Sequence, residues 1–227
     1  MLVDMPSNIN ISSKINGELT EYVDHLVQGH TSYCQNTVSE LLSRGWGVLD
    51  IFENLFYPSL VLVGKRWETN ELSVAQEHIA TCITETLITG LYPKIVQEKR
   101  AFSGFKAVVS CIENEHHQVG SKMISYLLEL WGLQVLYLGA DVPKTDLMIL
   151  TKTEKPDFIL FSITLYANMP IFIQTAKDLT SILPESEIIA GGQAFENMQS
   201  RLSLPRNVNI FKTLSNLKSY IESRLEQ

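Results

Sequence analysis

The sequence predicts two domains: an N-terminal four-helix bundle and a C-terminal α/β domain built on a doubly wound, parallel sheet of five strands. Two observations lead to this prediction. From Glu18 to about Arg100, apolar residues recur at helical spacing and the connections are short, as in a bundle. After Ser103-Gly104, short apolar strands alternate with helical segments, which is typical of a parallel sheet with helices on both faces.

The N-terminal part begins with a stretch that is polar, mixed and without period. Residues 1–16 are therefore expected to form a flexible leader, and residues 17–100 to form the helical bundle. Gly45 and Gly47, on either side of Trp46, predict a break between the second and third helices.

Two local signals concern the third and fourth helices of the bundle. Pro58 predicts a kink or a new turn in the third helix, because proline has no backbone N–H to donate. Ser73 is expected to cap the fourth helix, and Gln76 lies three residues later, at the spacing of a capping box.

The C-terminal domain is expected to cover residues 103–227, with the boundary near residues 99–105. Its predicted strands are 107–112, 133–138, 157–163, 186–190 and 208–211. Its predicted helices are roughly 118–131, 143–154, 169–182, 195–202 and 213–225. In open sheets of this kind, the loops at the carboxyl ends of the strands form a shared crevice that binds ligands.

The composition excludes several classes of protein. A net charge of −7 on 227 residues argues against direct nucleic-acid binding. No apolar run is long enough for a membrane span, and the start lacks the features of a signal peptide, so a cytoplasmic protein is expected. Cys34, Cys82 and Cys111 form no CxxC pair, and all three are interpreted as buried apolar filler.

An acid, an imidazole and a glycine fall within six residues at the end of the first predicted strand. His117 stands at a strand-to-helix turn, and Glu115 can hydrogen-bond its imidazole. Gly120, three residues later, leaves room for a bulky group close to the backbone. This combination predicts a large metallo-cofactor.

Two further elements follow later predicted strands and belong to the same crevice. Ser162-x-Thr164 ends the third strand, and Gly191-Gly192 follows the fourth. Small and hydroxyl residues at these places leave a slot and offer hydrogen bonds. The segment 139–143, after the second strand, belongs to the same rim.

Three motifs, Glu115-x-His117-x-x-Gly120, Ser162-x-Thr164 and Gly191-Gly192, lie at the ends of three predicted strands. Their residues and their spacing along the chain resemble the cobalamin-binding domain of corrinoid proteins over about residues 103–227. The resemblance implies a flavodoxin-like domain that binds cobalamin. It also implies that His117 is the lower axial ligand of cobalt, in place of the cofactor's own dimethylbenzimidazole. Imidazole is a suitable cobalt ligand, and Glu115 would fix its tautomer from the other ring nitrogen.

The same resemblance assigns further residues to the cofactor. It places the nucleotide tail beside Ser162 and the paired glycines, and it implies that Gly120 and Thr164 also line the cobalamin site. The family usually has Asp where this chain has Glu115, which is one methylene longer. His116 does not have the motif's spacing to Gly120, so we interpret it as a neighbour of the cofactor.

A second resemblance lies in the helical half. Trp67, followed after nine residues by Glu77-His78, is similar to the signature of light-sensing, cobalamin-dependent regulators, whose helical bundle caps the upper face of the corrin. It implies that Trp67 covers the upper ligand and that Glu77 and His78 hydrogen-bond an adenosyl group. Taken alone, the same residues could be a core tryptophan and a solvated first turn.

The chain departs from those regulators in two respects. Glu68 follows Trp67, where better-known members have a histidine that takes the upper cobalt position after light breaks the carbon–cobalt bond. The full-length regulators also carry an N-terminal DNA-binding domain, for which this chain is expected to have no room. Output is therefore expected to pass to a regulatory partner or through homo-oligomers.

The sequence thus predicts a cobalamin-binding sensor, responsive to light through photolysis of adenosylcobalamin, rather than an enzyme. Methylcobalamin is the alternative cofactor form. The alternative function is a methyl-carrying corrinoid subunit of a methyltransferase system. A third is a cobalamin-binding module without photochemistry, such as a carrier or a sensor of cofactor level. Trp67 and Glu77-His78 favour the sensor.

Overall fold

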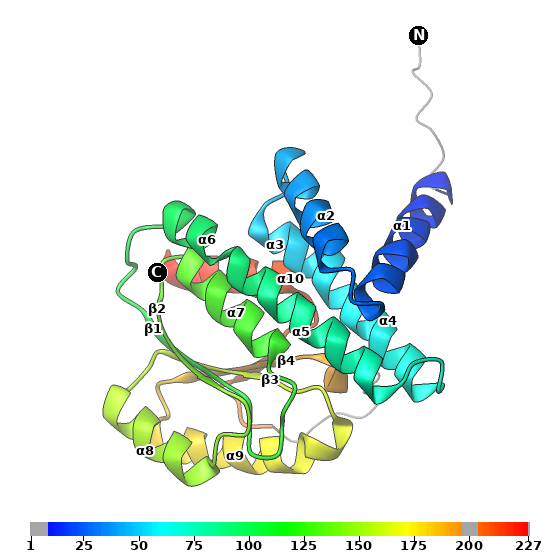
Figure 1. The fold of residues 1–227 in the computed structure, drawn as a ribbon. Helices are drawn as coiled ribbons and strands as arrows, with labels where there is room; N and C mark the ends of the chain where they lie inside the picture. The colour runs from blue at the N-terminus through cyan, green and yellow to red at the C-terminus, as the bar shows by residue number, and fades with distance from the viewer. Residues whose placement is uncertain (1–8, 197–203, 227) are drawn as a thin grey trace. The chain divides into compact units, whose positions relative to one another are not determined.

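The computed structural model describes residues 9–196 and 204–226, with side chains from residue 17 onward (Figure 1). The chain divides into two compact units, Met1–Gly90 and Leu91–Gln227, and each is described by itself. No helix among the described residues is long and apolar enough to span a membrane.

The N-terminal unit is the predicted helical bundle. Its helices are α1 (Ile9–Val27), α2 (Thr31–Ser43), α3 (Val48–Ile51), a π-helix η1 (Phe52–Phe56), α4 (Tyr57–Glu68) and α5 (Val74–Gly90). Because α3, η1 and α4 follow one another without a break, the unit has four helical rods among its described residues. Their core includes the buried side chains of Val23, Phe52, Val63 and Ile88.

The N-terminal leader is shorter than predicted. Helix α1 begins at Ile9, so residues 9–16 of the expected flexible leader are helical, while residues 1–8 lie outside the described ones. A helix that is already nucleated extends through polar residues at little cost, because each added residue gains one hydrogen bond. The absence of an apolar period therefore did not mark the start of this helix.

Pro58 is accommodated in a continuous helical run by a change of helix type. It lies in the first turn of α4, directly after the π-helix of η1. Since proline donates no backbone hydrogen bond, the widened turn before it absorbs the interruption without ending the rod. The prediction of a new turn at Pro58 is confirmed in this form.

The predicted capping box at the start of α5 is present. The Ser73 hydroxyl accepts from the backbone N–H of Gln76 at 3.3 Å, and the Gln76 side chain accepts from the backbone N–H of Ser73 at 3.0 Å. The Ser73 N–H has no carbonyl partner within the helix, whereas the Gln76 N–H is shared between the Ser73 hydroxyl and the Ser73 carbonyl, which it meets at 3.1 Å.

Replacing Ser73 with alanine should lower the free energy of unfolding by about 1 kcal/mol, because one helix-capping bond is lost. Urea unfolding followed by circular dichroism would measure this. Ser39→Ala is a suitable control, because the Ser39 hydroxyl only bonds the Gln35 carbonyl within α2 and caps no helix. Equal losses in the two variants would contradict the assignment of Ser73 as a cap.

The C-terminal unit is the predicted doubly wound sheet. Its elements are α6 (Tyr92–Glu98), β1 (Lys106–Ser110), α7 (Val119–Leu130), β2 (Gln134–Gly139), α8 (Lys144–Glu154), β3 (Phe158–Ser162), η2 (Tyr166–Asn168), α9 (Met169–Ile182), β4 (Glu187–Gly191), η3 (Gln193–Phe195), β5 (Val208–Ile210) and α10 (Leu214–Leu225). The helix predicted over 195–202 falls mostly outside the described residues, and a short 3-10 turn, η3, precedes that stretch.

The five strands are all parallel and lie in the order β2-β1-β3-β4-β5. Helices α7 and α10 cover one face of this sheet, and α8 and α9 cover the other (Figure 1). Strand β3 is buried along its whole length, as expected for a strand with helices on both sides. The strand order reverses direction at β1, so the ends of β1 and β3 form the switch point where such sheets bind ligands.

The boundary between the two units precedes the predicted one. It falls at Gly90–Leu91 rather than near residues 99–105, so α6 belongs to the sheet unit. The Tyr92 hydroxyl donates to Glu129 at 2.9 Å, and its ring lies against Tyr126 of α7 with centroids 4.9 Å apart. After Ser103, the change in the spacing of apolar residues marks the change from helix to strand. It does not mark the boundary between the two compact units.

The three cysteines differ in environment. Cys34 and Cys111 are buried, as predicted, but Cys82 is exposed on α5, so its assignment as buried filler is wrong. Helix α5 carries apolar residues on both sides, including the exposed Val74 and Ile79. Apolar pattern alone therefore did not distinguish its buried face.

Candidate functional site

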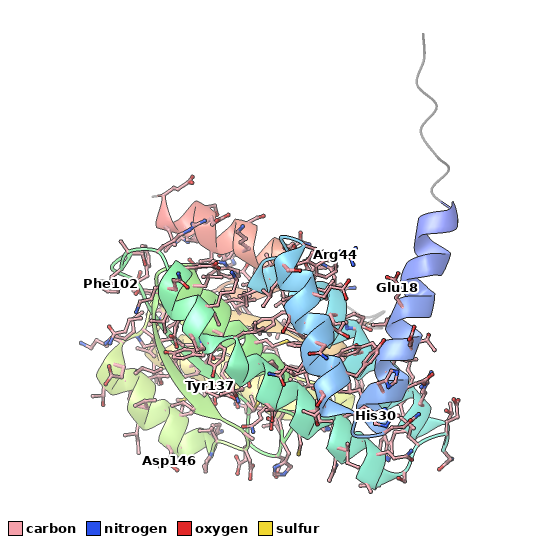
Figure 2. The ribbon with its side chains drawn as sticks, turned by 45° about the horizontal axis from the view of Figure 1, so that its top comes forward. Glu18, His30, Arg44, Phe102, Tyr137 and Asp146 are labelled. Carbon is pink, nitrogen blue, oxygen red and sulfur yellow. The ribbon has the colours of Figure 1, made fainter. Side chains whose placement is uncertain are left out.

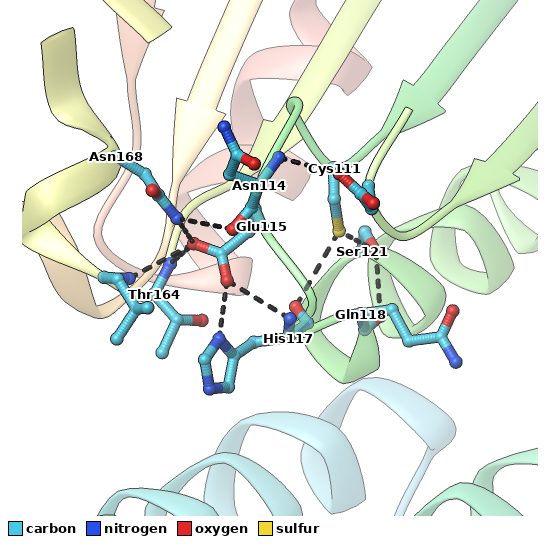
Figure 3. A network of polar contacts seen from close by, with 10 residues as sticks. Cys111, Asn114, Glu115, His117, Gln118, Ser121, Thr164 and Asn168 are labelled. Atoms are coloured by element: carbon cyan, nitrogen blue, oxygen red, sulfur yellow. Dashed lines mark hydrogen bonds and ion pairs between the residues drawn. The ribbon is translucent and has the colours of Figure 1, made fainter. Parts of the chain in front are cut away.

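Two loops meet at the switch point of the sheet, one after β1 and one after β3 (Figure 3). The first loop is tied to the rim after β2, where the backbone N–H of Asn114 donates to Asp141 at 2.8 Å and the N–H of Asp141 donates to the Glu115 carbonyl at 2.9 Å. The predicted rim segment 139–143 therefore contacts the loop that carries His117.

Glu115 joins the two loops through a buried carboxylate. Its side chain is fully buried, and one oxygen, Oε2, accepts from the backbone N–H groups of Thr164 at 3.1 Å and Leu165 at 3.2 Å. The other oxygen, Oε1, accepts from His117 twice, from the backbone N–H at 3.1 Å and from Nδ1 at 2.6 Å. The extra methylene of Glu115, compared with Asp, carries the carboxylate to donors from both loops.

Asn168 completes this network and was not identified from the sequence. Its side chain is buried, and its amide donates to Glu115 Oε2 at 3.1 Å and to the Asn114 carbonyl at 3.2 Å (Figure 3). Asn168 ends the short 3-10 turn η2, which begins after the Ser162-x-Thr164 element. A single asparagine after a strand carries no pattern, and its proximity to a strand end was the only available signal.

The network keeps Glu115 ionised. Burial alone would raise the pKa of this carboxyl, but hydrogen bonds from His117, Asn168 and the backbone outweigh it and lower the pKa from 4.5 to about 2. An ionised carboxylate can only accept hydrogen bonds, so Nδ1 of His117 carries the proton. Nε2 then carries the lone pair, on a side chain that is 48% exposed. This is the tautomer that a metal-binding imidazole requires.

Gly120 and Ser162 lie against each other although 42 positions separate them in the sequence. A Cβ added to Gly120 would lie 2.4 Å from the Ser162 hydroxyl oxygen. Ser162 is buried, and among the described residues no hydrogen bond is found for its hydroxyl. The absence of a Cβ at Gly120 thus makes room for the Ser162 hydroxyl, which can hydrogen-bond a ligand.

The paired glycines, Gly191 and Gly192, serve close backbone contacts. A Cβ at Gly191 would lie 2.8 Å from the Phe211 carbonyl oxygen, and one at Gly192 would lie 2.4 Å from the Ile163 carbonyl oxygen. Ser162 and Gly191 pair in register, and the N–H of Ile163 donates to the Gly191 carbonyl at 2.9 Å. The space left by the missing side chains of these glycines is filled by the backbone of Phe211 and Ile163. The two glycines therefore allow the ends of neighbouring strands to lie close together, which sets the width of any ligand slot between them.

Gly192→Ala should lower the free energy of unfolding by about 3 kcal/mol, because Gly192 has a φ of +108° and its new methyl group would meet backbone atoms. Gly45→Ala is the matched control, since Gly45 has a φ of +90° but nothing within 4 Å of an added Cβ. Urea unfolding of both variants would separate the cost of the close contact from the cost of the positive φ. Similar losses would contradict the packing role.

The remaining predicted residues of the sheet unit take different positions. Thr164 contributes its backbone N–H to Glu115 and is half-buried. His116 is exposed, and its carbonyl accepts from the backbone N–H of Gln118 at 3.0 Å. The hydrogen bonds to Glu115 involve His117 and not His116, which agrees with the choice of His117 as the ligand candidate.

Trp67, Glu77 and His78 belong to the helical unit. Trp67 lies in the last turn of α4 and is 46% exposed, so it is not a core residue. Glu77 lies in the first turn of α5, where it accepts from His78 Nδ1 at 2.5 Å and from the Thr81 hydroxyl at 2.9 Å. His78 is exposed. Thus a large aromatic face and a paired carboxylate and imidazole are presented at the ends of two consecutive helices.

Both units match known protein families. Residues 105–209 match the model of a B12 binding domain, and residues 18–91 match a second model of the same description. The fold and these matches define the class: a helical B12 binding domain followed by a flavodoxin-like α/β B12 binding domain. They support membership in a cobalamin-binding family.

The relatives of the chain fall into two groups. The HTH-type transcriptional repressor CarH of Myxococcus xanthus is 29% identical over 174 residues, which cover 74% of this chain but only 56% of CarH. Trimethylamine corrinoid protein 1 of Methanosarcina acetivorans is 24% identical over 191 residues, which cover 83% of this chain and 85% of that protein. The chain therefore spans little more than half the length of CarH.

Solved structures agree with the fold. The monomethylamine corrinoid protein of Methanosarcina barkeri has a TM-score of 0.73 at 17% identity and covers 92% of this chain and 99% of its own. The methanol:cobalamin methyltransferase complex MtaBC of the same organism has a TM-score of 0.51 at 13% identity, over 100% of this chain and 94% of its own. At these identities the likeness concerns the fold alone.

The residues at the switch point fit a cobalamin. A ring nitrogen with its lone pair, fixed by a buried carboxylate, is a suitable donor for cobalt. The Ser162 hydroxyl, which lies where a Cβ of residue 120 would be, is a polar group at the same edge of the sheet.

Proposed function

We propose that this chain is a cobalamin-binding sensor that responds to light and signals to a regulatory partner, or to further copies of itself, by rearranging its domains. The observation that carries the cobalamin part is the bond of 2.6 Å between Glu115 and His117 Nδ1, which orients the imidazole as a ligand. The regulatory part is supported by the similarity to CarH, a transcriptional repressor.

In this proposal the residues of the sheet unit hold the lower side of the cofactor. His117 Nε2 binds cobalt, and Glu115 keeps the proton on Nδ1 so that the lone pair stays on Nε2. Ser162 and Gly120 lie beside the displaced nucleotide tail, with Gly191 and Gly192 shaping the slot through the strand ends.

Residues of the helical unit are assigned to the upper side. The exposed Trp67 ring covers the upper ligand and excludes water from it. Glu77 and His78 hydrogen-bond the ribose or base of an adenosyl group. When bound, adenosylcobalamin supplies a cobalt–carbon bond that light can break. With Glu68 after Trp67, the helical unit offers no imidazole at that position to replace the lost group.

The decisive experiment is spectroscopic. The purified chain is loaded with adenosylcobalamin in darkness and its absorbance and oligomeric state are recorded before and after green light. We expect both to change. An unchanged spectrum together with an unchanged oligomeric state would reject the light sensor and leave a cobalamin-binding protein without photochemistry.

A methyl-carrying corrinoid subunit is the second candidate. It is favoured by the similarity to trimethylamine corrinoid protein 1, which extends over 85% of that protein. In that case the chain loaded with methylcobalamin should pass its methyl group to a thiol acceptor when a partner methyltransferase is added. Dark, enzyme-dependent demethylation would support the carrier, and its absence alongside a light response would support the sensor.

A further inference from the structure

A pair of histidines lies at the turn between α1 and α2, within the helical unit. His25 is in the last turn of α1. His30, labelled in Figure 2, is the residue before α2. Their Nδ1 atoms are 2.8 Å apart. The turn itself is tight, because Gly29 has a φ of +79° and the backbone N–H of His30 donates to the His25 carbonyl at 3.0 Å.

The His25 ring is held by neighbours on both helices. The Tyr33 ring from α2 stacks on it, with centroids 3.7 Å apart and an interplanar angle of 23°. The Tyr33 hydroxyl donates to Glu21 at 3.2 Å, and Glu21 lies one turn before His25 on α1. The imidazole is therefore oriented before any ligand binds, as metal-binding histidines are by their surroundings.

Two imidazole nitrogens at this distance can share a proton or bind one cation together. Ligands at about 2.0 Å from a metal and at right angles to each other are about 2.8 Å apart, whereas tetrahedral zinc needs about 3.3 Å. The observed 2.8 Å between Nδ1 atoms matches the right-angled case. Nearby negative charge comes from Glu21, since Asp24 is paired with Arg66 at 2.6 Å.

We infer that His25 and His30 form a two-histidine site for a tetragonal divalent transition-metal ion, with copper(II) preferred over nickel(II). Within the described residues no group of three or more histidines, cysteines and carboxylates is arranged to hold a metal, so solvent supplies the other ligands. Because one histidine comes from each side of the turn, bound metal would lock the end of α1 to the start of α2.

The test is a titration of the full, cobalamin-free chain with copper(II), followed by calorimetry and electron paramagnetic resonance. We expect one tight equivalent whose spectrum shows coupling to two imidazole nitrogens. Replacing His25 or His30 with alanine should raise its dissociation constant by about tenfold or more, because one imidazole then remains. Retention of the tight equivalent in either variant would overturn the site.

Tyr33 provides the matched pair of controls. Tyr33→Phe keeps the ring that stacks on His25 and should leave copper affinity unchanged, whereas Tyr33→Ala removes the support and should weaken binding several-fold. The variants His25→Gln and His30→Gln keep a polar side chain in the turn, so they should lose metal binding while the helical unit stays folded. Circular dichroism would verify that the fold is kept. The copper titration uses the cobalamin-free chain, so its outcome does not depend on whether the chain binds cobalamin.

Discussion

Replacing His117 with alanine should abolish the absorbance signature of histidine-bound cobalamin and weaken cobalamin binding by about tenfold or more. The reason is that the alanine variant has no imidazole at the position where Glu115 now fixes a lone pair on Nε2. Spectral titration with aquocobalamin would measure both effects. The fold should persist, because the His117 side chain is 48% exposed.

The matched control for this experiment is His116→Ala. His116 is the adjacent histidine, it is exposed, and the Glu115 carboxylate does not hold its ring. We expect its variant to keep the histidine-bound spectrum. If His116→Ala lost that spectrum and His117→Ala kept it, the assignment of the cobalt ligand would be reversed. If both kept it, the cobalt site would lie elsewhere.

Replacing Glu115 with alanine should lower the free energy of unfolding by about 3–5 kcal/mol. The variant leaves the N–H groups of Thr164 and Leu165 and the Asn168 amide without their acceptor in a buried place. Urea unfolding would measure the loss. Glu113→Ala, on an exposed position of the same loop, should change stability by less than about 0.5 kcal/mol.

The Glu115 carboxylate also predicts a pH dependence of stability. Its pKa is lowered from 4.5 to about 2 in the folded chain, so the unfolded chain binds a proton first as the pH falls. The stabilisation is complete above about pH 5 and is lost between there and pH 2, by about 3 kcal/mol. Glu115→Gln should lack this component, so its unfolding free energy should fall less over that range. Parallel curves for both proteins would contradict the prediction.

Much of the fold could be predicted from the sequence, because the spacing of apolar residues along a helix or strand follows which side chains are buried. The strand order placed the ends of β1, β3 and β4 at one edge, so the proximity of Gly120 to Ser162 followed from their positions after strands. The hydrogen bond that the Glu115 carboxylate accepts from the His117 imidazole was likewise expected from their spacing and is present.

Other features depended on contacts that leave no pattern. Asn168 acts through one amide in a short turn, and α6 joins the sheet unit through the contacts of Tyr92 with α7. Both features depend on contacts between segments that are distant in the sequence, and the local spacing of apolar residues does not reveal such contacts. The π-helix before Pro58 was also missed, because its apolar residues continue a helical stripe.

That π-helix adjusts the rotational phase of the rod that carries Trp67. The buried residues Val48 and Val63 are fifteen positions apart, while four turns of an α-helix take about 14.4 residues, which would leave Val63 about 60° off the stripe. The wider turn of η1 absorbs the surplus residue, so α4 keeps its apolar face inward. Removing one residue from Phe52–Phe56 would remove the surplus that η1 absorbs, so the rod would continue as a plain α-helix with α4 in nearly the same phase. Removing a second residue would turn everything after it by about 100°, so the segment tolerates the loss of one residue and not of two.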